Sequence, residues 1–165
     1  DKRYLFDTEV VYTSSVDEAA SHLNKTTGKI FITTGSKELD KYTIIDDYKN
    51  RCVARVLPTA EVMDKCEKLG FCGKNLICMQ GPFSEEMNTA LIHQFHISYV
   101  LTKNSGANGG FIEKIKSAEQ TDTTLVVIGR PAEQTKGYLL EDVICEYESN
   151  HSFMGLLTTQ SSDVQ

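Results

Sequence analysis

Two lysines and three glycines lie close together in the second half of the chain and could bind an anion. Lys103 is followed by Gly106, Gly109 and Gly110, and Lys114 comes four residues later. Because glycine has no Cβ, the backbone N–H groups of such a loop can approach a ligand closely. The N-terminal end of a following helix favours negative charge, and the lysines would add positive charge at the two rims. The stretch therefore predicts an anion-binding loop.

The same stretch has a second interpretation. A connection from a strand to a helix often contains glycine because the turn needs a positive φ, and Lys114 would then only solvate the exposed face of the helix. The chain contains neither a P-loop nor a G-x-G-x-x-G pattern. Both interpretations stay open at this point, and the loop alone names no ligand.

The flanking residues predict which elements position this loop. The apolar run 99–101 precedes it, and Phe111, Ile112, Ile115 and Ala118 follow at helical spacing, which indicates a strand, a loop and a helix. Similar patterns predict further strands at 9–12, 30–32, 42–45, 52–57, 76–79 and 125–128. Helices are predicted over 16–23 and 59–69, after Ser84 with Met87, Ala90, Leu91 and Phe95 inward, and near the end with Leu140, Val143, Ile144 and Tyr147 inward.

Alternation of strands and helices, with strands that are continuously apolar, predicts the fold class. It is typical of an α/β domain with a doubly wound, mostly parallel, Rossmann-like sheet. We expect this domain to cover 1–150 and a polar tail to follow at 151–165. Four strands end in polar, glycine-bearing or basic loops, at 33–37, 80–84, 103–110 and 129–131. Because the carboxyl ends of such strands share one edge, these loops are expected to form one ligand site.

Composition excludes several classes of function. A formal net charge of −6 argues against nucleic-acid binding driven by phosphate neutralisation, although a local basic cluster could hold a small anion. No apolar run is long enough for a membrane span, so no membrane partner and a cytoplasmic location are expected. The five cysteines form no C-x-x-C motif and are expected to be reduced and mainly buried, without a metal site. Because the chain starts at Asp1 without a natural beginning, we expect it to be part of a longer protein.

Five motifs in order resemble one enzyme family. They read TTGSK at 33–37, ARVLPT at 54–59, MQGPFSEE at 79–86, TKNSG with GG and EK over 102–114, and RP at 130–131. Together they resemble the precorrin-6A or cobalt-precorrin-6A reductases of corrin biosynthesis, also called precorrin-6x reductases. The likeness runs from about residue 10 to 131. Gly129 departs from the family, which frequently has a second arginine there, so Arg130 would have to serve alone.

The resemblance implies a two-domain oxidoreductase that transfers hydride from NADPH or NADH to a ring double bond of a polycarboxylate tetrapyrrole. The family's first domain has a glycine-bearing start and a His-Pro motif, which this chain lacks, so the chain would be the C-terminal domain and the N-terminal domain would be its missing partner. The implied cofactor-binding residues are Thr34, Gly35, Ser36, Gln80, Gly81, Pro82, Ser105, Gly106, Gly109 and Gly110. The implied substrate-binding residues are Lys37, Arg55, Lys103 and Arg130, since arginine and lysine bind carboxylates.

Several alternatives stay open. Lys103 or solvent could supply the proton that the reduction needs, because His93 and His96 are expected at the surface of a helix end. Arg55 could instead be paired at a strand edge. The chain could also be a non-catalytic nucleotide- or anion-binding module, or a regulatory or assembly domain whose loops only turn the chain. The sequence does not distinguish NADPH from NADH or a metal-free from a cobalt-containing substrate, and it does not give the oligomeric state.

Overall fold

Six parallel strands form the centre of the structure, a computed structural model that describes residues 8–105 and 110–129. Their order across the sheet is β1-β6-β5-β2-β3-β4. The strands are β1 (Val10–Thr13), β2 (Lys29–Ile32), β3 (Cys52–Val56), β4 (Leu76–Cys78), β5 (Ile97–Lys103) and β6 (Thr124–Ile128). This arrangement confirms the α/β fold class with its parallel, Rossmann-like sheet.

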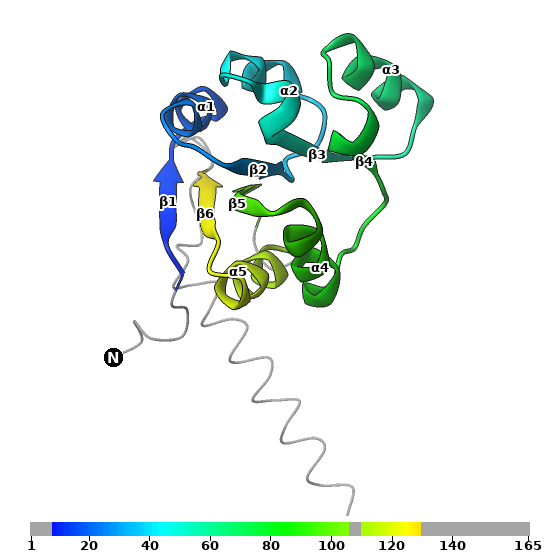
Figure 1. Cartoon of the computed structure of the whole chain (residues 1–165). Helices are drawn as coiled ribbons and strands as arrows, with labels where there is room; N and C mark the ends of the chain where they lie inside the picture. The colour runs from blue at the N-terminus through cyan, green and yellow to red at the C-terminus, as the bar shows by residue number, and fades with distance from the viewer. Residues whose placement is uncertain (1–7, 106–109, 130–165) are drawn as a thin grey trace, which may run out of the picture. The chain divides into compact units, whose positions relative to one another are not determined.

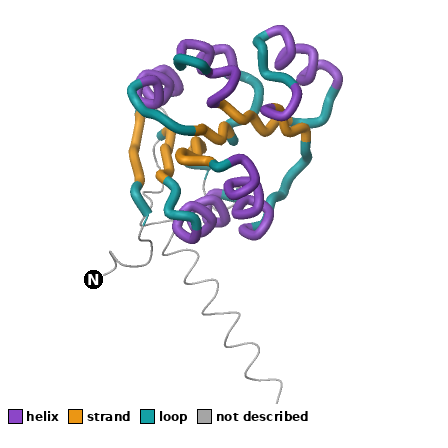
Figure 2. Tube along the Cα trace, in the orientation of Figure 1, coloured by secondary structure: helices purple, strands orange, loops and turns teal. Residues whose placement is uncertain are grey.

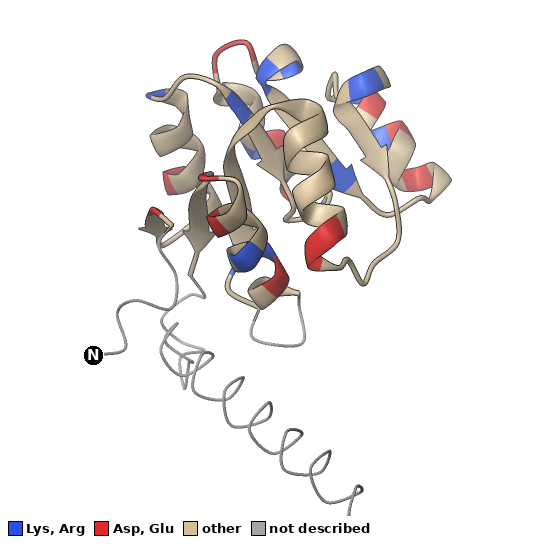
Figure 3. Cartoon of the chain, turned by 60° about the horizontal axis from the view of Figure 1, so that its bottom comes forward, with Lys and Arg blue, Asp and Glu red and all other residues tan. Residues whose placement is uncertain are grey.

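Helices cover both faces of the sheet, as a buried parallel sheet requires. Figure 1 shows α1, α2 and α3 above the sheet and α4 and α5 below it, and Figure 2 shows the same layers by secondary structure. The helices are α1 (Val16–Asn24), η2 (Leu39–Ile44), α2 (Tyr48–Arg51), α3 (Ala60–Lys68), η3 (Gly73–Asn75), α4 (Glu85–Phe95) and α5 (Phe111–Gln120). Acidic and basic residues are interspersed over these helices, without one sign gathering on a single face in the view of Figure 3.

Side-chain caps set the start of three helices. Ser15, Thr59 and Ser84 each accept a hydrogen bond from the backbone N–H three residues later, at 3.1, 3.3 and 3.1 Å. Each bond satisfies a backbone donor that the first helical turn leaves without a partner. The helix starts predicted near residues 16, 59 and 85 are therefore confirmed.

Replacing Ser84 with alanine is expected to lower the free energy of unfolding by about 1 kcal/mol, because the N–H of Met87 loses its acceptor. Urea unfolding followed by circular dichroism measures the change. Ser84→Gly is the matched control and should cost only about a few tenths of a kcal/mol. Equal losses in both variants would contradict the capping role.

The strand predicted at 42–45 is wrong, since this segment belongs to the 3₁₀ helix η2. Leu39 and Tyr42 are both fully buried and stand three residues apart, which is the spacing that places two side chains on one side of a 3₁₀ helix. The hydroxyl of Tyr42 lies 3.0 Å from Oγ1 of Thr34, and burial raises the pKa of Tyr42 to about 12. The pair therefore ties η2 to the loop after β2.

The predicted inner face of α4 is wrong in part. Asn88 and Ile92 are buried and Leu91 and Phe95 are partly buried, whereas Met87 and Ala90 are exposed. Apolar spacing alone could not find this orientation, because a polar residue occupies the inward position. Its partner on the sheet is described below.

The expectation for the cysteines is confirmed in part. Cys52 and Cys66 are buried free thiols, and burial raises the pKa of the Cys52 thiol to about 12, but Cys72 is exposed. Among the described residues no helix is long and apolar enough to cross a membrane, and no group of three His, Cys, Asp or Glu side chains is placed to hold a metal. The helix predicted around 140–147, the domain boundary at 150 and the tail 151–165 lie outside the described residues.

Candidate functional site

The carboxyl ends of the strands meet at one edge of the sheet. The N–H of Thr33, just after β2, donates to the carbonyl of Leu101 in β5 at 3.0 Å, and the N–H of Asn104 donates to Ile128 in β6 at 3.0 Å. The chain leaves β2 toward β3 and β4 but leaves β5 toward β6, on the opposite side. This reversal of direction is the position at which open α/β sheets bind ligands.

A cavity of about 470 Å³ lies at the ends of β2, β3 and β4. Its lining comes from four of the five sequence motifs and consists of Thr33, Gly35, Arg55, Val56, Leu57, Met79, Gly81, Pro82, Phe83, Gly110 and Lys114. The motifs that are separate in the sequence therefore converge on one space. The fifth motif begins at Arg130, which lies outside the described residues.

Arg55 is the central charged residue of this cavity. Its Nη1 donates to Oδ1 of Asn88 at 2.8 Å. Its guanidinium carbon lies 5.0 Å from the ring centroid of Phe31 and 3.6 Å from that of Phe83, so two aromatic rings hold it by cation–π contact. Only 5% of Arg55 is exposed. Burial lowers its pKa to about 10, which leaves it charged at neutral pH.

Strand alternation explains why Arg55 points toward α4. Ala54 and Val56 belong to the hydrophobic cluster that also contains α1 and η2, so the residue between them faces the other side of the sheet. On that side Arg55 contacts Asn88 of α4, which lies 33 residues later in the sequence. Arg55 is thus a buried residue on the inner face of a strand, and not one paired at a strand edge.

Lys114 is the second buried cation in the cavity. It lies on the first turn of α5 and is only 8% exposed, so the interpretation that it solvates an outer helix face is wrong. Burial, reinforced by the nearby positive charge of Arg55, lowers the pKa of Lys114 to about 8, while Glu113 acts in the opposite direction. A lysine with this pKa is mostly charged at neutral pH and partly neutral at slightly alkaline pH.

Glycines shape the walls on either side. Gly35, after β2, has φ +78°, and a Cβ built there would meet nothing within 4 Å. Gly110, which caps α5, has φ +67°. Both positions favour glycine because other residues rarely adopt this backbone conformation.

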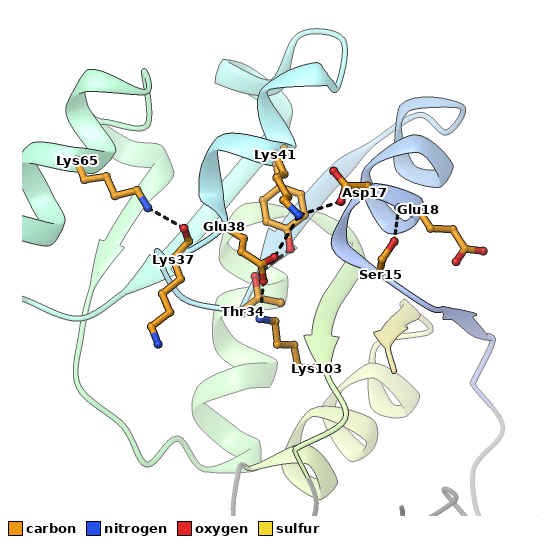
Figure 4. A network of polar contacts seen from close by, with 10 residues as sticks. Ser15, Asp17, Glu18, Thr34, Lys37, Glu38, Lys41, Lys65 and Lys103 are labelled. Carbon is orange, nitrogen blue, oxygen red and sulfur yellow. Dashed lines mark hydrogen bonds and ion pairs between the residues drawn. The ribbon is translucent and has the colours of Figure 1, made fainter. Parts of the chain in front are cut away.

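A second cavity of about 350 Å³ lies at the ends of β1, β5 and β6. The polar residues that line it are Ser14, Ser15, Glu38, Lys103, Asn104 and Ser105. The ammonium of Lys103 lies 2.8 Å from the Glu38 carboxylate, which also pairs with Lys41 at 3.3 Å, and Lys41 reaches Asp17 at 2.8 Å (Figure 4). Hydrogen bonding to Lys103 is the main cause of the lowered pKa of Glu38. Here each lysine has an acidic partner.

The structure separates the predicted site residues into groups. Gly35, Arg55, Gly81, Pro82 and Gly110 line the first cavity, and Lys103 and Ser105 line the second. The remaining predicted residues line neither cavity: Thr34 contacts Tyr42, Ser36 is half-buried, Gln80 and Lys37 are exposed, and the Lys37 carbonyl accepts from Lys65 (Figure 4). Gly106, Gly109 and Arg130 lie outside the described residues. His93 and His96 are exposed, as predicted.

Sequence reasoning did not reveal that Phe31, Phe83 and Asn88 hold Arg55 in place. The sequence did contain one signal for Arg55. A single charged residue inside the apolar run 53–57 indicates either an edge strand or a charged side chain that is buried because it has a functional role. No sequence signal identified Asn88, because its partner lies on a distant strand.

Three comparisons with known proteins agree with one another. The family model described as "Precorrin-6x reductase CbiJ/CobK" matches residues 2–148. The chain is 38% identical over 120 residues to the cobalt-precorrin-6A reductase of Priestia megaterium, covering 72% of this chain and 47% of that protein. It is 36% identical over 129 residues to the cobalt-precorrin-6A reductase of Salmonella typhimurium, covering 78% and 49%.

A solved structure shares the fold. It is described as "CobK precorrin-6A reductase" and superimposes with a TM-score of 0.59 at 18% sequence identity, over 76% of this chain and 48% of that chain. At this identity the likeness shows the fold alone. The chain spans about half the length of the curated relatives it matches.

Proposed function

The chain belongs to the precorrin-6x reductase family, and from this premise we propose that it supplies one α/β half of an enzyme that reduces a ring double bond of precorrin-6A or cobalt-precorrin-6A. The hydride comes from NADPH or NADH. The N-terminal half of this enzyme supplies the opposite wall of the site. The reaction belongs to corrin biosynthesis.

The observation that carries this proposal is the convergence of four motifs on the cavity at the ends of β2, β3 and β4. Scattered motifs would favour a likeness of fold alone, whereas convergence at the position where direction reverses favours a ligand site. Arg55 and Lys114 give that site positive charge, as a polycarboxylate substrate requires.

The chain's residues also fit a dinucleotide. Open space above Gly35 and the glycine at the start of α5 suit phosphate or ribose groups, and Ser14, Ser15 and Ser105 offer hydroxyls in the second cavity. We assign cofactor binding to Thr34, Gly35, Ser36, Gln80, Gly81, Pro82, Ser105, Gly106, Gly109 and Gly110. The bound cofactor would supply the hydride, while these residues orient it and exclude water.

Substrate carboxylates are assigned to Lys37, Arg55, Lys103 and Arg130. Among these Arg55 is the strongest candidate, because its guanidinium is fixed by two rings and an amide before any ligand arrives. Lys103 is oriented by Glu38 and stands at the second cavity. It contributes there as part of an ion pair.

Replacing Gly35 with valine in the reductase that contains this chain is expected to weaken the binding of NADPH or NADH by about tenfold or more. Gly35 has φ +78°, which a β-branched residue rarely adopts, so valine should displace the loop after β2. Isothermal titration measures the affinity. Gly73→Val is the matched control: its φ is +60° and a Cβ there also meets nothing within 4 Å, but Gly73 lies in η3 just before β4, at the strand's opposite end. Equal affinities of the two variants would remove the loop from the cofactor site.

The alternative is a nucleotide- or anion-binding module without catalysis. The same titration tests it when combined with an assay of NADPH oxidation in the presence of precorrin-6A or its cobalt form. Cofactor binding without oxidation in the complete reductase would favour the module.

A further inference from the structure

Two positive charges share one buried cavity. Arg55 is 5% exposed and Lys114 is 8% exposed, and both line the space of about 470 Å³ at the ends of β2, β3 and β4. The charge of Arg55 acts directly on Lys114. Burying two like charges together is unfavourable unless an anion offsets them.

The described part of the chain provides no carboxylate for Arg55. The ion pairs among residues 8–105 and 110–129 involve lysines, and Arg55 takes part in none of them. Its guanidinium instead contacts an amide oxygen and two aromatic ring faces, which are uncharged. A buried guanidinium that is oriented but lacks an acidic partner is suited to binding an external anion.

The walls of the cavity indicate which anion fits. Val56, Leu57 and Met79 line it beside the two cations, together with the ring of Phe83. Apolar walls favour methylene groups, and a guanidinium favours a planar acid that accepts two parallel hydrogen bonds. An alkyl carboxylate has both parts, whereas inorganic phosphate has no apolar part.

We propose that Arg55 and Lys114 together bind one alkyl carboxylate side chain of the substrate, and that Lys114 takes up a proton as this carboxylate enters the cavity. The proposal rests on the proposed function for the identity of the substrate. The binding chemistry itself depends only on the cavity and its two cations.

Charged groups on several elements bear on Lys114. Arg55 on β3 disfavours its charged form, and Glu113 on its own helix favours it. On α4, which packs against α5, Glu85 lies 3.9 Å from Lys116; on β5, Lys103 pairs with Glu38. Strand β6 contains no titratable residue. A carboxylate that enters the cavity would act on Lys114 in the same direction as Glu113.

The direction of the proton exchange follows from linkage. Without a ligand the pKa of Lys114 is lowered to about 8, so at pH 8.5 roughly three quarters of the molecules hold it neutral. A carboxylate beside it favours the charged form and raises the pKa again. Binding at pH 8.5 should therefore take up protons from the buffer, and binding at pH 6.5 should not.

The test uses the 165-residue chain and propane-1,2,3-tricarboxylate as the probe, titrated calorimetrically at pH 8.5 in buffers with different ionisation enthalpies. We expect uptake of roughly half a proton or more per bound probe. Lys114→Met should abolish the uptake and weaken binding about tenfold. Lys116→Met is the matched control, because it removes the same charge two residues along the same helix, beside Glu85, and it should preserve both.

Three results would overturn the proposal: no binding of the tricarboxylate, unchanged proton uptake in Lys114→Met, or binding of inorganic phosphate in preference to the carboxylate. Circular dichroism and the melting temperature establish that each variant is folded. Arg55→Lys retains the positive charge but loses the planar guanidinium with its paired donors. Weaker binding with preserved proton uptake would support a role of Arg55 in binding the carboxylate and of Lys114 in taking up the proton. Because the probe is neither a dinucleotide nor a tetrapyrrole, its binding is measured independently of reductase activity.

Discussion

Replacing Arg55 with alanine is expected to lower the free energy of unfolding by about 3 kcal/mol. The change removes two cation–π contacts, with Phe31 and Phe83, and leaves Oδ1 of the buried Asn88 without its donor. Release of a buried charge offsets part of this loss. Chemical denaturation of the 165-residue chain measures the difference. Binding of the tricarboxylate probe should be lost as well.

A double-mutant cycle separates the contact from the cavity that alanine leaves. Arg55→Met combined with Asn88→Leu replaces both partners by apolar groups, so the double variant should be destabilised by less than the sum of the two single variants. The expected coupling is at least about 1.5 kcal/mol, as for other hydrogen bonds with a charged donor. Strict additivity would show that the 2.8 Å contact contributes nothing to stability.

Replacing Phe111 with alanine is expected to have the larger effect on stability, about 4 kcal/mol. Phe111 is the first residue of α5 and is fully buried, so its removal leaves a cavity between the helix and the sheet. The melting temperature should fall by roughly 8–16 °C for a chain of 165 residues. Because Phe111 fixes the start of α5, the adjacent Gly110 and the nearby Lys114 should also lose their positions in the site.

Two variants control for the loss of apolar volume. Phe111→Leu retains most of the side chain and should cost much less than Phe111→Ala. Met87→Ala removes a partly exposed side chain from α4 and should cost below about 1 kcal/mol. Similar losses for Phe111→Ala and Met87→Ala would contradict the view that the first residue of α5 anchors the helix.

The fold was largely predictable because its central strands are buried on both faces. Runs such as Ile30–Ile32 and Leu125–Ile128 are apolar at every position, and a parallel sheet under two helical layers accounts for that pattern. The prediction at 42–45 failed because Tyr42 is apolar in pattern but is buried by a 3₁₀ turn, where side chains repeat every three residues. A pattern of four residues is too short to distinguish a strand from a 3₁₀ helix.

The candidate site was predictable in place but not in detail. Glycines and polar residues after strands indicate the edge of the sheet, and Gly35, Gly81 and Gly110 do line one cavity. The burial of Lys114 could not be predicted. Helical spacing identifies the inward face of a helix from its apolar residues, and it does not indicate when a lysine packs inward as well. The division of Arg55 and Lys103 between two cavities depends on the order of strands across the sheet, which periodicity alone does not determine.

The strand order has a consequence for the way this chain is made. Residue Val10 of β1 pairs with Leu125 of β6, and β1 has no other neighbour among the described strands. Their separation is 125 − 10 = 115 residues, so at a synthesis rate of about 5–20 residues per second β6 is made roughly 6–23 s after β1. During that interval β2, β3 and β4 can already pair with one another, since each follows its neighbour along the chain. Of the six strands described here, β1 is therefore synthesised first but completes its pairing last.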